Sequence, residues 1–185
     1  MKQLLITTHL YTFAVICVIA TTISSCTFKK KTDMETPTGT KENELTMLVG
    51  TYTSGDSKGI YSFRFNEETG TATALSETEV ENPSYLAVSA DGKFIYTVSE
   101  FNNEQAAANA FAFNQEKGTL KLLNSQKTGG EDPCYIITNG NNVITANYSG
   151  GSISVFPIAK DGSLLPASDI IKFEGSGTDK ERQEK

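Results

Sequence analysis

Carboxylate, amide and phenol side chains recur in this sequence where an apolar run is about to begin or has just ended. Glu100, for example, closely follows the apolar run 95–98. A carboxylate at the end of a strand can act as a general base that activates water, while amides and phenols can orient a polyhydroxylated ring. We therefore take Glu100 as the candidate catalytic residue, and as candidate substrate-binding residues Asn82, Tyr85, Asp132, Asn147 and Tyr148.

Each candidate also has a structural interpretation. Asn82-Pro83 and Asp132-Pro133 are turn-forming dipeptides, since Asx and Pro residues shape a turn without any ligand. Tyr85 could equally pack in the protein interior, and Glu100 could be a solvated loop residue. The sequence leaves both interpretations open.

Histidine and cysteine usage narrows the chemistry. The one histidine is His9, and the three cysteines are Cys17, Cys26 and Cys134. His9 and Cys17 lie in a segment typical of an export signal, so no histidine remains beyond it to activate Cys134 or to bind a metal. We expect no cofactor and no metal. The net charge of −6, without a basic stripe, also argues against a nucleic-acid partner.

The candidate residues lie at equivalent positions of a repeat. Residues 82–88 (Asn-Pro-Ser-Tyr-Leu-Ala-Val) and 132–138 (Asp-Pro-Cys-Tyr-Ile-Ile-Thr) start 50 residues apart, and each precedes a turn and two further apolar runs. Hairpin glycines recur at Gly70, Gly118 and Gly162, 48 and 44 residues apart. Such a period, built from short alternating runs like 60–65, indicates the blades of a β-propeller.

The repeat predicts an all-β fold. Residues 47–52 align with 94–100, the second strand of a unit, so the first unit lacks its innermost strand. We count three strands, then four, then four: a partial β-propeller of about two and three-quarter blades of four-stranded antiparallel sheets. Closed propellers commonly take the missing strand from the other end of the chain, so we expect a fragment of a larger ring. The loops that enter the innermost strand and leave the second strand should share one face.

Composition divides the chain into four segments. Lys2, the apolar stretch 10–20 and small residues before Cys26 predict a lipoprotein signal peptide over 1–25, with a transmembrane anchor as the alternative. A flexible tether over 26–46, a partial propeller over 47–175 and a disordered tail at a truncation over 176–185 follow. We expect an exported bacterial lipoprotein, lipidated on Cys26 and held at the periplasmic side or the outer membrane.

Several segments together resemble the amino-terminal part of the lactonase family, seven-bladed propellers that include cycloisomerase-type 6-phosphogluconolactonases. These segments are 49–53 (Val-Gly-Thr-Tyr-Thr), 59–61 (Gly-Ile-Tyr), 82–87, 132–135 and 146–152 (Ala-Asn-Tyr-Ser-Gly-Gly-Ser). The resemblance implies a sugar-lactone hydrolase that uses activated water on a small-molecule lactone and acts as a monomer. The family's His-containing segment and its anion-binding Arg and Glu residues would lie beyond Lys185, so we expect this chain alone to be inactive.

Two other functions stay open. The same face could bind a carbohydrate or a protein without catalysis, or the scaffold could serve a muconate-type cycloisomerase. The export signal points to a lactone outside the cytoplasm.

Overall fold

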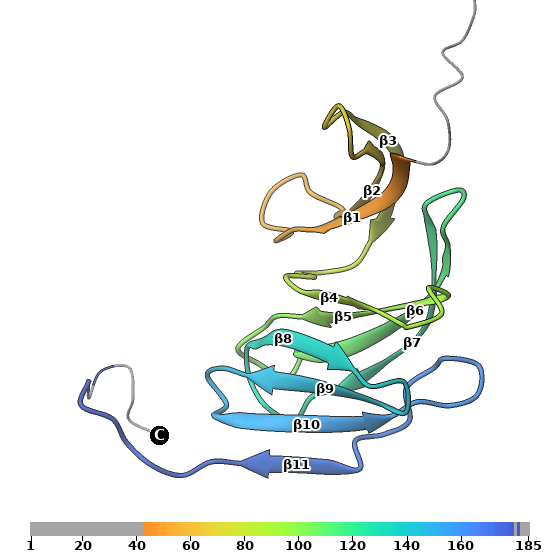
Figure 1. Ribbon diagram of the computed structural model, residues 1–185. Coiled ribbons are helices and arrows are strands. Elements are labelled where there is room, and N and C mark those ends of the chain that lie inside the picture. The colour runs from red at the N-terminus through yellow and green to blue at the C-terminus, as the bar shows by residue number, and fades with distance from the viewer. Residues whose placement is uncertain (1–42, 180, 182–185) are drawn as a thin grey trace, which may run out of the picture. The chain divides into compact units, whose positions relative to one another are not determined.

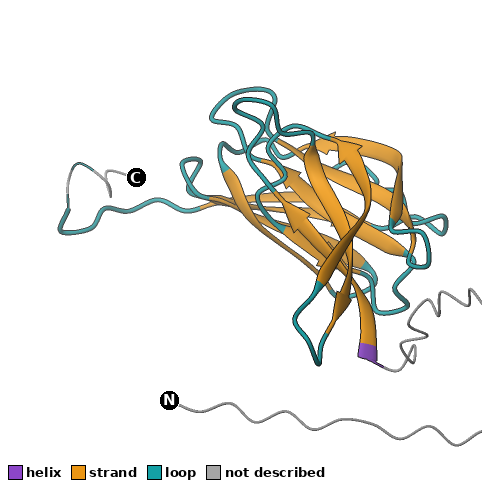
Figure 2. Ribbon diagram, turned by 90° about the horizontal axis from the view of Figure 1, so that it is seen from above, coloured by secondary structure: helices purple, strands orange, loops and turns teal. Residues whose placement is uncertain are grey.

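The computed structural model describes residues 43–179 and 181. The predicted signal peptide, its Cys26 and most of the predicted tether lie outside this part, as does the end of the predicted tail. The described chain consists of strands and loops with one short helical turn, at Asn43 beside the first strand (Figure 2). Among these residues no helix is long and apolar enough to cross a membrane. The predicted all-β class is confirmed.

Eleven strands form three antiparallel sheets, which follow one another in chain order (Figure 1). The first sheet contains β1 (Glu44–Gly50), β2 (Gly59–Asn66) and β3 (Ala72–Glu79). The second contains β4 (Leu86–Val88), β5 (Phe94–Ser99), β6 (Ala107–Asn114) and β7 (Thr119–Lys127). The third contains β8 (Pro133–Thr138), β9 (Asn142–Asn147), β10 (Ser152–Pro157) and β11 (Asp169–Lys172). The predicted count of three, four and four strands is confirmed, and β1 and β5 belong to separate sheets as a propeller requires.

The first strand begins earlier than the sequence indicated. β1 starts at Glu44, where it pairs with Asn66, whereas the predicted strand began at Met47. The alternation of apolar residues does not extend to Glu44 and Thr46, so only their pairing with β2 reveals them as part of the strand.

The repeat is visible in the backbone. Bulges interrupt the pairing after Ser62 and after Ala110, 48 residues apart, at the same place in two successive sheets. The hairpin glycines Gly70, Gly118 and Gly162 have φ angles of 70°, 68° and 86°, a left-handed conformation that glycine adopts without steric cost. These shared irregularities show that the sheets are copies of one structural unit.

Apolar side chains fill the space between consecutive sheets. Between the first and second sheets the core consists of Ile60, Ile95 and Phe111. Between the second and third it consists of Tyr96, Val98, Ala108, Ala110, Ile136, Val143, Phe156 and Leu164. β5 serves both cores because successive side chains on a strand point to opposite faces. This stacking fixes the strand ends, and hence the loops that carry the candidate residues.

Candidate functional site

Five loops, those that follow β1, β3, β5, β7 and β9, lie at the same end of the sheets because neighbouring strands are antiparallel. Hydrogen bonds join these loops across the sheets. The backbone N–H of Thr53 donates to Asn82 Oδ1 at 3.0 Å, and that of Asp132 donates to the carbonyl oxygen of Phe101 at 2.8 Å. The structure therefore brings residues from three sheets to one end, which carries all the candidate residues except the buried Asn147 side chain.

Asn82 and Asp132 open equivalent loops in an unusual conformation. Their φ angles are 45° and 49°, and no other described residue apart from glycine has a positive φ. Asn and Asp tolerate this left-handed region better than most residues. The Asn82 amide is bound by protein groups, because Oδ1 accepts from Thr53 and Nδ2 donates to the Glu100 carbonyl oxygen at 3.2 Å. The Asp132 carboxylate accepts a short hydrogen bond from the Ser149 hydroxyl.

The Glu100 carboxylate lies between the first and second sheets. Its residue is half-buried, and its backbone N–H donates to the Asn82 carbonyl oxygen at 3.0 Å. Its Oε2 accepts a hydrogen bond from the Tyr52 hydroxyl, at 3.0 Å. That hydrogen bond raises the pKa of the Tyr52 phenol, as do burial and the charge of the carboxylate, while the Ser84 hydroxyl acts in the opposite direction. Tyr52 therefore stays protonated and donates to Glu100 at neutral pH.

Tyrosines form the exposed part of this end. The rings of Tyr85 and Tyr135 lie 4.8 Å apart between centroids, tilted by 55°, in a contact between the second and third sheets. Both remain about two-fifths exposed (42% and 41%), and Tyr148 is 64% exposed. An aromatic pair of this kind packs favourably and can offer a face to a ring-shaped ligand.

Asn147 lies apart from the other candidates. Its side chain is 2% exposed, and its Nδ2 donates to Ser152 Oγ at 3.0 Å and to Ser154 Oγ at 2.8 Å. Its Oδ1 accepts from Thr145 Oγ1 at 3.0 Å. These partners all belong to β9 and β10, so Asn147 stabilises the third sheet and we leave it out of the proposals below.

Cys134 is a free, exposed thiol beside the candidate carboxylates. Burial raises the pKa of this thiol, and the charges of Glu100 and Asp132 raise it further, so the reactive thiolate is disfavoured. Within residues 43–179 and 181, no three His, Cys, Asp or Glu side chains gather as a metal site would require.

Two residues of this end were not selected from the sequence. Tyr52 and Ser84 lie on loops of the predicted face, but nothing in their surroundings in the sequence indicated a link to Glu100. The Ser84 hydroxyl is buried, and the described residues give it no hydrogen-bond partner. One signal for Tyr52 was available: it lies 48 residues before Glu100, the distance that also separates Gly70 from Gly118.

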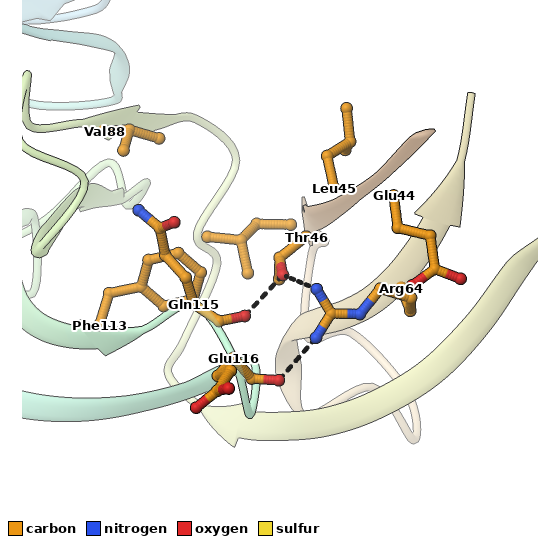
Figure 3. Close-up of a pocket in the computed structure, with 9 residues that line it drawn as sticks. Glu44, Leu45, Thr46, Arg64, Val88, Phe113, Gln115 and Glu116 are labelled. Atoms are coloured by element: carbon orange, nitrogen blue, oxygen red, sulfur yellow. Dashed lines mark hydrogen bonds between the residues drawn. The ribbon is translucent and has the colours of Figure 1, made fainter. Parts of the chain in front are cut away.

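The opposite end of the first two sheets holds a crevice of about 550 Å³, shown in Figure 3. Arg64 lines this crevice, but its guanidinium is already hydrogen-bonded to protein groups. Nη1 donates to Thr46 Oγ1 at 3.0 Å and Nη2 to the carbonyl oxygen of Glu116 at 2.6 Å (Figure 3). Arg64 thus fastens the β6–β7 hairpin to the first sheet, and we do not place the functional site there.

Comparison with known proteins identifies the fold family. Residues 46–185 match the profile of the lactonase family, described as seven-bladed β-propellers. A 6-phosphogluconolactonase of Bacillus subtilis is 37% identical over 143 residues, which cover 74% of this chain and 40% of that protein. A 6-phosphogluconolactonase of Formosa agariphila is 34% identical over 145 residues, again 40% of its length. The chain therefore spans about two-fifths of these curated relatives.

Solved structures agree with this assignment. A crystal structure of a Bacteroides fragilis protein, provisionally assigned as a 6-phosphogluconolactonase, is 71% identical, with a TM-score of 0.76 over 77% of this chain and 40% of that one. The periplasmic gluconolactonase of Pseudomonas aeruginosa is 32% identical, with a TM-score of 0.63 over 69% of this chain and 38% of that one. The chain belongs to the lactonase family of seven-bladed β-propellers.

Proposed function

We propose that the whole protein hydrolyses a sugar lactone, with Glu100 as the general base. The observation that carries this proposal is the match to relatives named 6-phosphogluconolactonase, at 37% and 34% identity. The geometry supports it, because the half-buried Glu100 carboxylate lies among loops of three sheets at one end of the structure. Asn82, Tyr85, Asp132 and Tyr148 lie on the same loops and are the candidate substrate contacts.

The reaction needs one base and one water molecule. Glu100 takes a proton from water, and the resulting hydroxide forms a bond to the lactone carbonyl carbon. The ring C–O ester bond then breaks, and the departing alkoxide takes the proton back from the Glu100 carboxyl. The product is the open-chain hydroxy acid, and the carboxylate is restored.

The substrate is either a phosphorylated or a neutral sugar lactone. Curated relatives are named for 6-phosphogluconolactone, whereas the Pseudomonas aeruginosa relative is named a periplasmic gluconolactonase. The export signal predicted over 1–25 favours a neutral lactone, because sugar phosphates are largely confined to the cytoplasm. We therefore propose glucono-lactone-type substrates before phosphorylated ones.

The test is an assay of the protein, at the full length that its gene encodes, on both lactones. We expect turnover above the spontaneous rate and its loss, by about 100-fold or more, in Glu100→Gln. Glu67→Gln is the matched control, since Glu67 is an exposed residue of the β2–β3 hairpin at the other end of the first sheet. Hydrolysis of neither lactone, or full activity of Glu100→Gln, would contradict the proposal.

A second candidate function is carbohydrate binding without catalysis. The exposed Tyr85–Tyr135 pair favours it, since exposed phenol rings can pack against the apolar face of a sugar ring. Calorimetric titration with gluconate and with neutral sugars distinguishes the two: binding that is unaffected by Glu100→Gln, together with no turnover, favours the binding protein.

We further propose that the protein is anchored by lipid on Cys26. The support is the sequence alone: a basic Lys2, an apolar stretch and the Ile-Ser-Ser-Cys ending at 23–26. Labelling of cells with radioactive palmitate should mark the wild-type protein but not Cys26→Ser. Cys17→Ser is the control, and equal labelling of Cys26→Ser would refute the anchor.

A further inference from the structure

Three residues recur at one position of successive sheets. Tyr52, Glu100 and Tyr148 are spaced by 48 residues, and each follows the second strand of its unit at the same end of the structure. In a stack of repeated units, equivalent residues from neighbouring sheets come close to one another. The exit of the second strand is therefore a position at which one blade can act on the next.

The contact between the first two of these residues is specific. The Tyr52 hydroxyl donates to Glu100 Oε2 at 3.0 Å, and the two residues belong to different sheets. The Tyr52 hydroxyl thus holds the carboxylate by one of its two oxygens, and Oε1 takes no part in this contact.

A second, independent observation points to the same place. Ser84 Oγ is buried and makes no hydrogen bond of regular geometry with the described residues, although it lies close enough to the Tyr52 phenol to lower its pKa by a weak hydrogen-bonding contact. Buried hydroxyls without a partner are rare in folded proteins, and they commonly mark a water or ligand atom. Among the described side chains, Ser84 Oγ is the single buried polar atom left without such a partner.

We propose that Tyr52 is a positioning residue that holds Glu100 by Oε2, and that the Ser84 hydroxyl beside it contacts the attacking water or a substrate hydroxyl. This inference rests on the proposed hydrolysis and deepens it, because it makes the site a joint product of the first two blades. Tyr52 itself does not touch the reacting atoms. Its loss should let the carboxylate rotate away from the water, which lowers turnover more than affinity.

The first experiment tests the contact without any activity measurement. The absorbance of ionised tyrosine is followed during an alkaline titration of four proteins: wild type, Glu100→Gln, Tyr52→Phe and the double variant. Because Glu100 raises the pKa of Tyr52, one phenol should ionise at lower pH in Glu100→Gln than in wild type. That difference should be absent between Tyr52→Phe and the double variant, because neither protein has a phenol at position 52. Identical titrations of wild type and Glu100→Gln would overturn the proposal.

The second experiment tests the role. In the full-length protein, Tyr52→Phe should lower kcat about 10-fold with KM changed less than about twofold. Tyr61→Phe is the matched control in the same sheet, where the Tyr61 hydroxyl accepts a hydrogen bond from the Lys58 N–H at 2.9 Å. Ser84→Ala should lower kcat/KM, with Ser84→Thr, which keeps the hydroxyl, closer to wild type.

The outcomes separate the two proposals. A shifted titration with unchanged kcat in Tyr52→Phe would refute the positioning role while leaving hydrolysis intact. Unchanged kcat/KM in Ser84→Ala would refute the Ser84 contact. Absence of any wild-type turnover would refute the proposed function, and with it the positioning role of Tyr52, while the titration still decides whether the Tyr52–Glu100 contact exists.

Discussion

At the scale of the residue, the Asn82 side chain joins two loops through hydrogen bonds, an arrangement that we call the Asn82 clamp. Its Oδ1 accepts from the backbone N–H and the hydroxyl of Thr53, and its Nδ2 donates to the carbonyl oxygen of Glu100. It therefore ties the exit of the first sheet to the loop that presents the candidate base. Asn82 both shapes its own turn and helps to place the loop of Glu100. The interpretation of Asn82-Pro83 as a turn and its interpretation as part of the site are therefore not exclusive.

Substitutions of Asn82 measure how much its side-chain hydrogen bonds and its left-handed backbone conformation matter to the stability of the protein. Asn82→Ala should destabilise the protein by about 1–3 kcal/mol, because it leaves the half-buried Thr53 N–H unpaired and places alanine at a φ of 45°. Asn82→Asp keeps the acceptor for Thr53 and should cost less. Urea-induced unfolding measures both. Equal stability of Asn82→Ala and wild type would show that the clamp contributes nothing.

Asp91 makes a pH-dependent contribution in the β4–β5 turn. Hydrogen bonds from the Ser89 hydroxyl and the Lys93 N–H, together with the Lys93 ammonium, lower the pKa of this carboxyl from 3.8 to about 2. The folded state thus favours the carboxylate. Its stabilisation is fully present above pH 3.8 and is lost as the pH falls towards about 2.

Asp91→Asn should remove this part of the acid sensitivity. We expect the unfolding midpoint in urea to fall less steeply between pH 4 and pH 2 in the variant than in wild type. The control is Asp56→Asn, because the Asp56 carboxylate makes no hydrogen bond or ion pair with the described residues. Parallel pH profiles for wild type and Asp91→Asn would contradict the expectation.

At the scale of the element, the first sheet meets the second through a glycine. A Cβ atom at Gly50 would lie 2.0 Å from the carbonyl oxygen of Pro83 and 2.6 Å from Leu86 Cδ1. The end of β1 can therefore approach the loop that carries Asn82 only without a side chain. Space, not a left-handed backbone, requires glycine here.

Gly50→Ala should consequently destabilise the protein by about 1–3 kcal/mol, since the carbonyl oxygen belongs to the backbone and cannot rotate away. The same shift should disturb the neighbouring Asn82 clamp. Gly175→Ala, where a Cβ would meet nothing within 4 Å, should change stability by less than about 0.5 kcal/mol. Thermal unfolding compares the two, and equal midpoints would refute the close approach.

The strands were largely predictable from the sequence, but the contacts that they make with neighbouring sheets were not. Turn residues and alternating runs were enough to place the strands, because they report local backbone preferences. Strand β2 shows the limit. Its alternation was visible, yet Ser62 is 1% exposed and donates to the Gly118 carbonyl oxygen at 2.7 Å in the second sheet. The alternation of residue types along a strand does not show that its polar face is buried against the next sheet.

The candidate site was predictable in the same partial way. The repeat placed Asn82, Glu100 and Asp132 at one end of the sheets, because strand direction follows from the count of strands. The contacts of Tyr52 and the inward side chain of Asn147 depend on how neighbouring strands and sheets pack. Such long-range packing cannot be read from local spacing.

At the scale of the whole molecule, the described sheets have uncovered outer surfaces. In the third sheet Ile137 is 47% exposed and Ile171 43%, and the strand register puts both on the face away from the second sheet. By contrast, the apolar side chains that face a neighbouring sheet are buried in the two cores. Exposed apolar residues on one face of a sheet are usually covered by a neighbouring structure, as the next blade covers them in a seven-bladed ring.

Activity should therefore depend on blades that this chain does not supply. The 185-residue chain covers 40% of the Bacteroides fragilis protein, and its candidate site contains residues from three sheets only. We expect the 185-residue chain by itself to hydrolyse neither lactone above the spontaneous rate. Joining it to the part of the Bacteroides fragilis protein that lies beyond the match should restore turnover, and Glu100→Gln in that longer protein should abolish it. Turnover by the 185-residue chain alone, equal to that of the longer protein, would show that three blades suffice and that the ring is not required for catalysis.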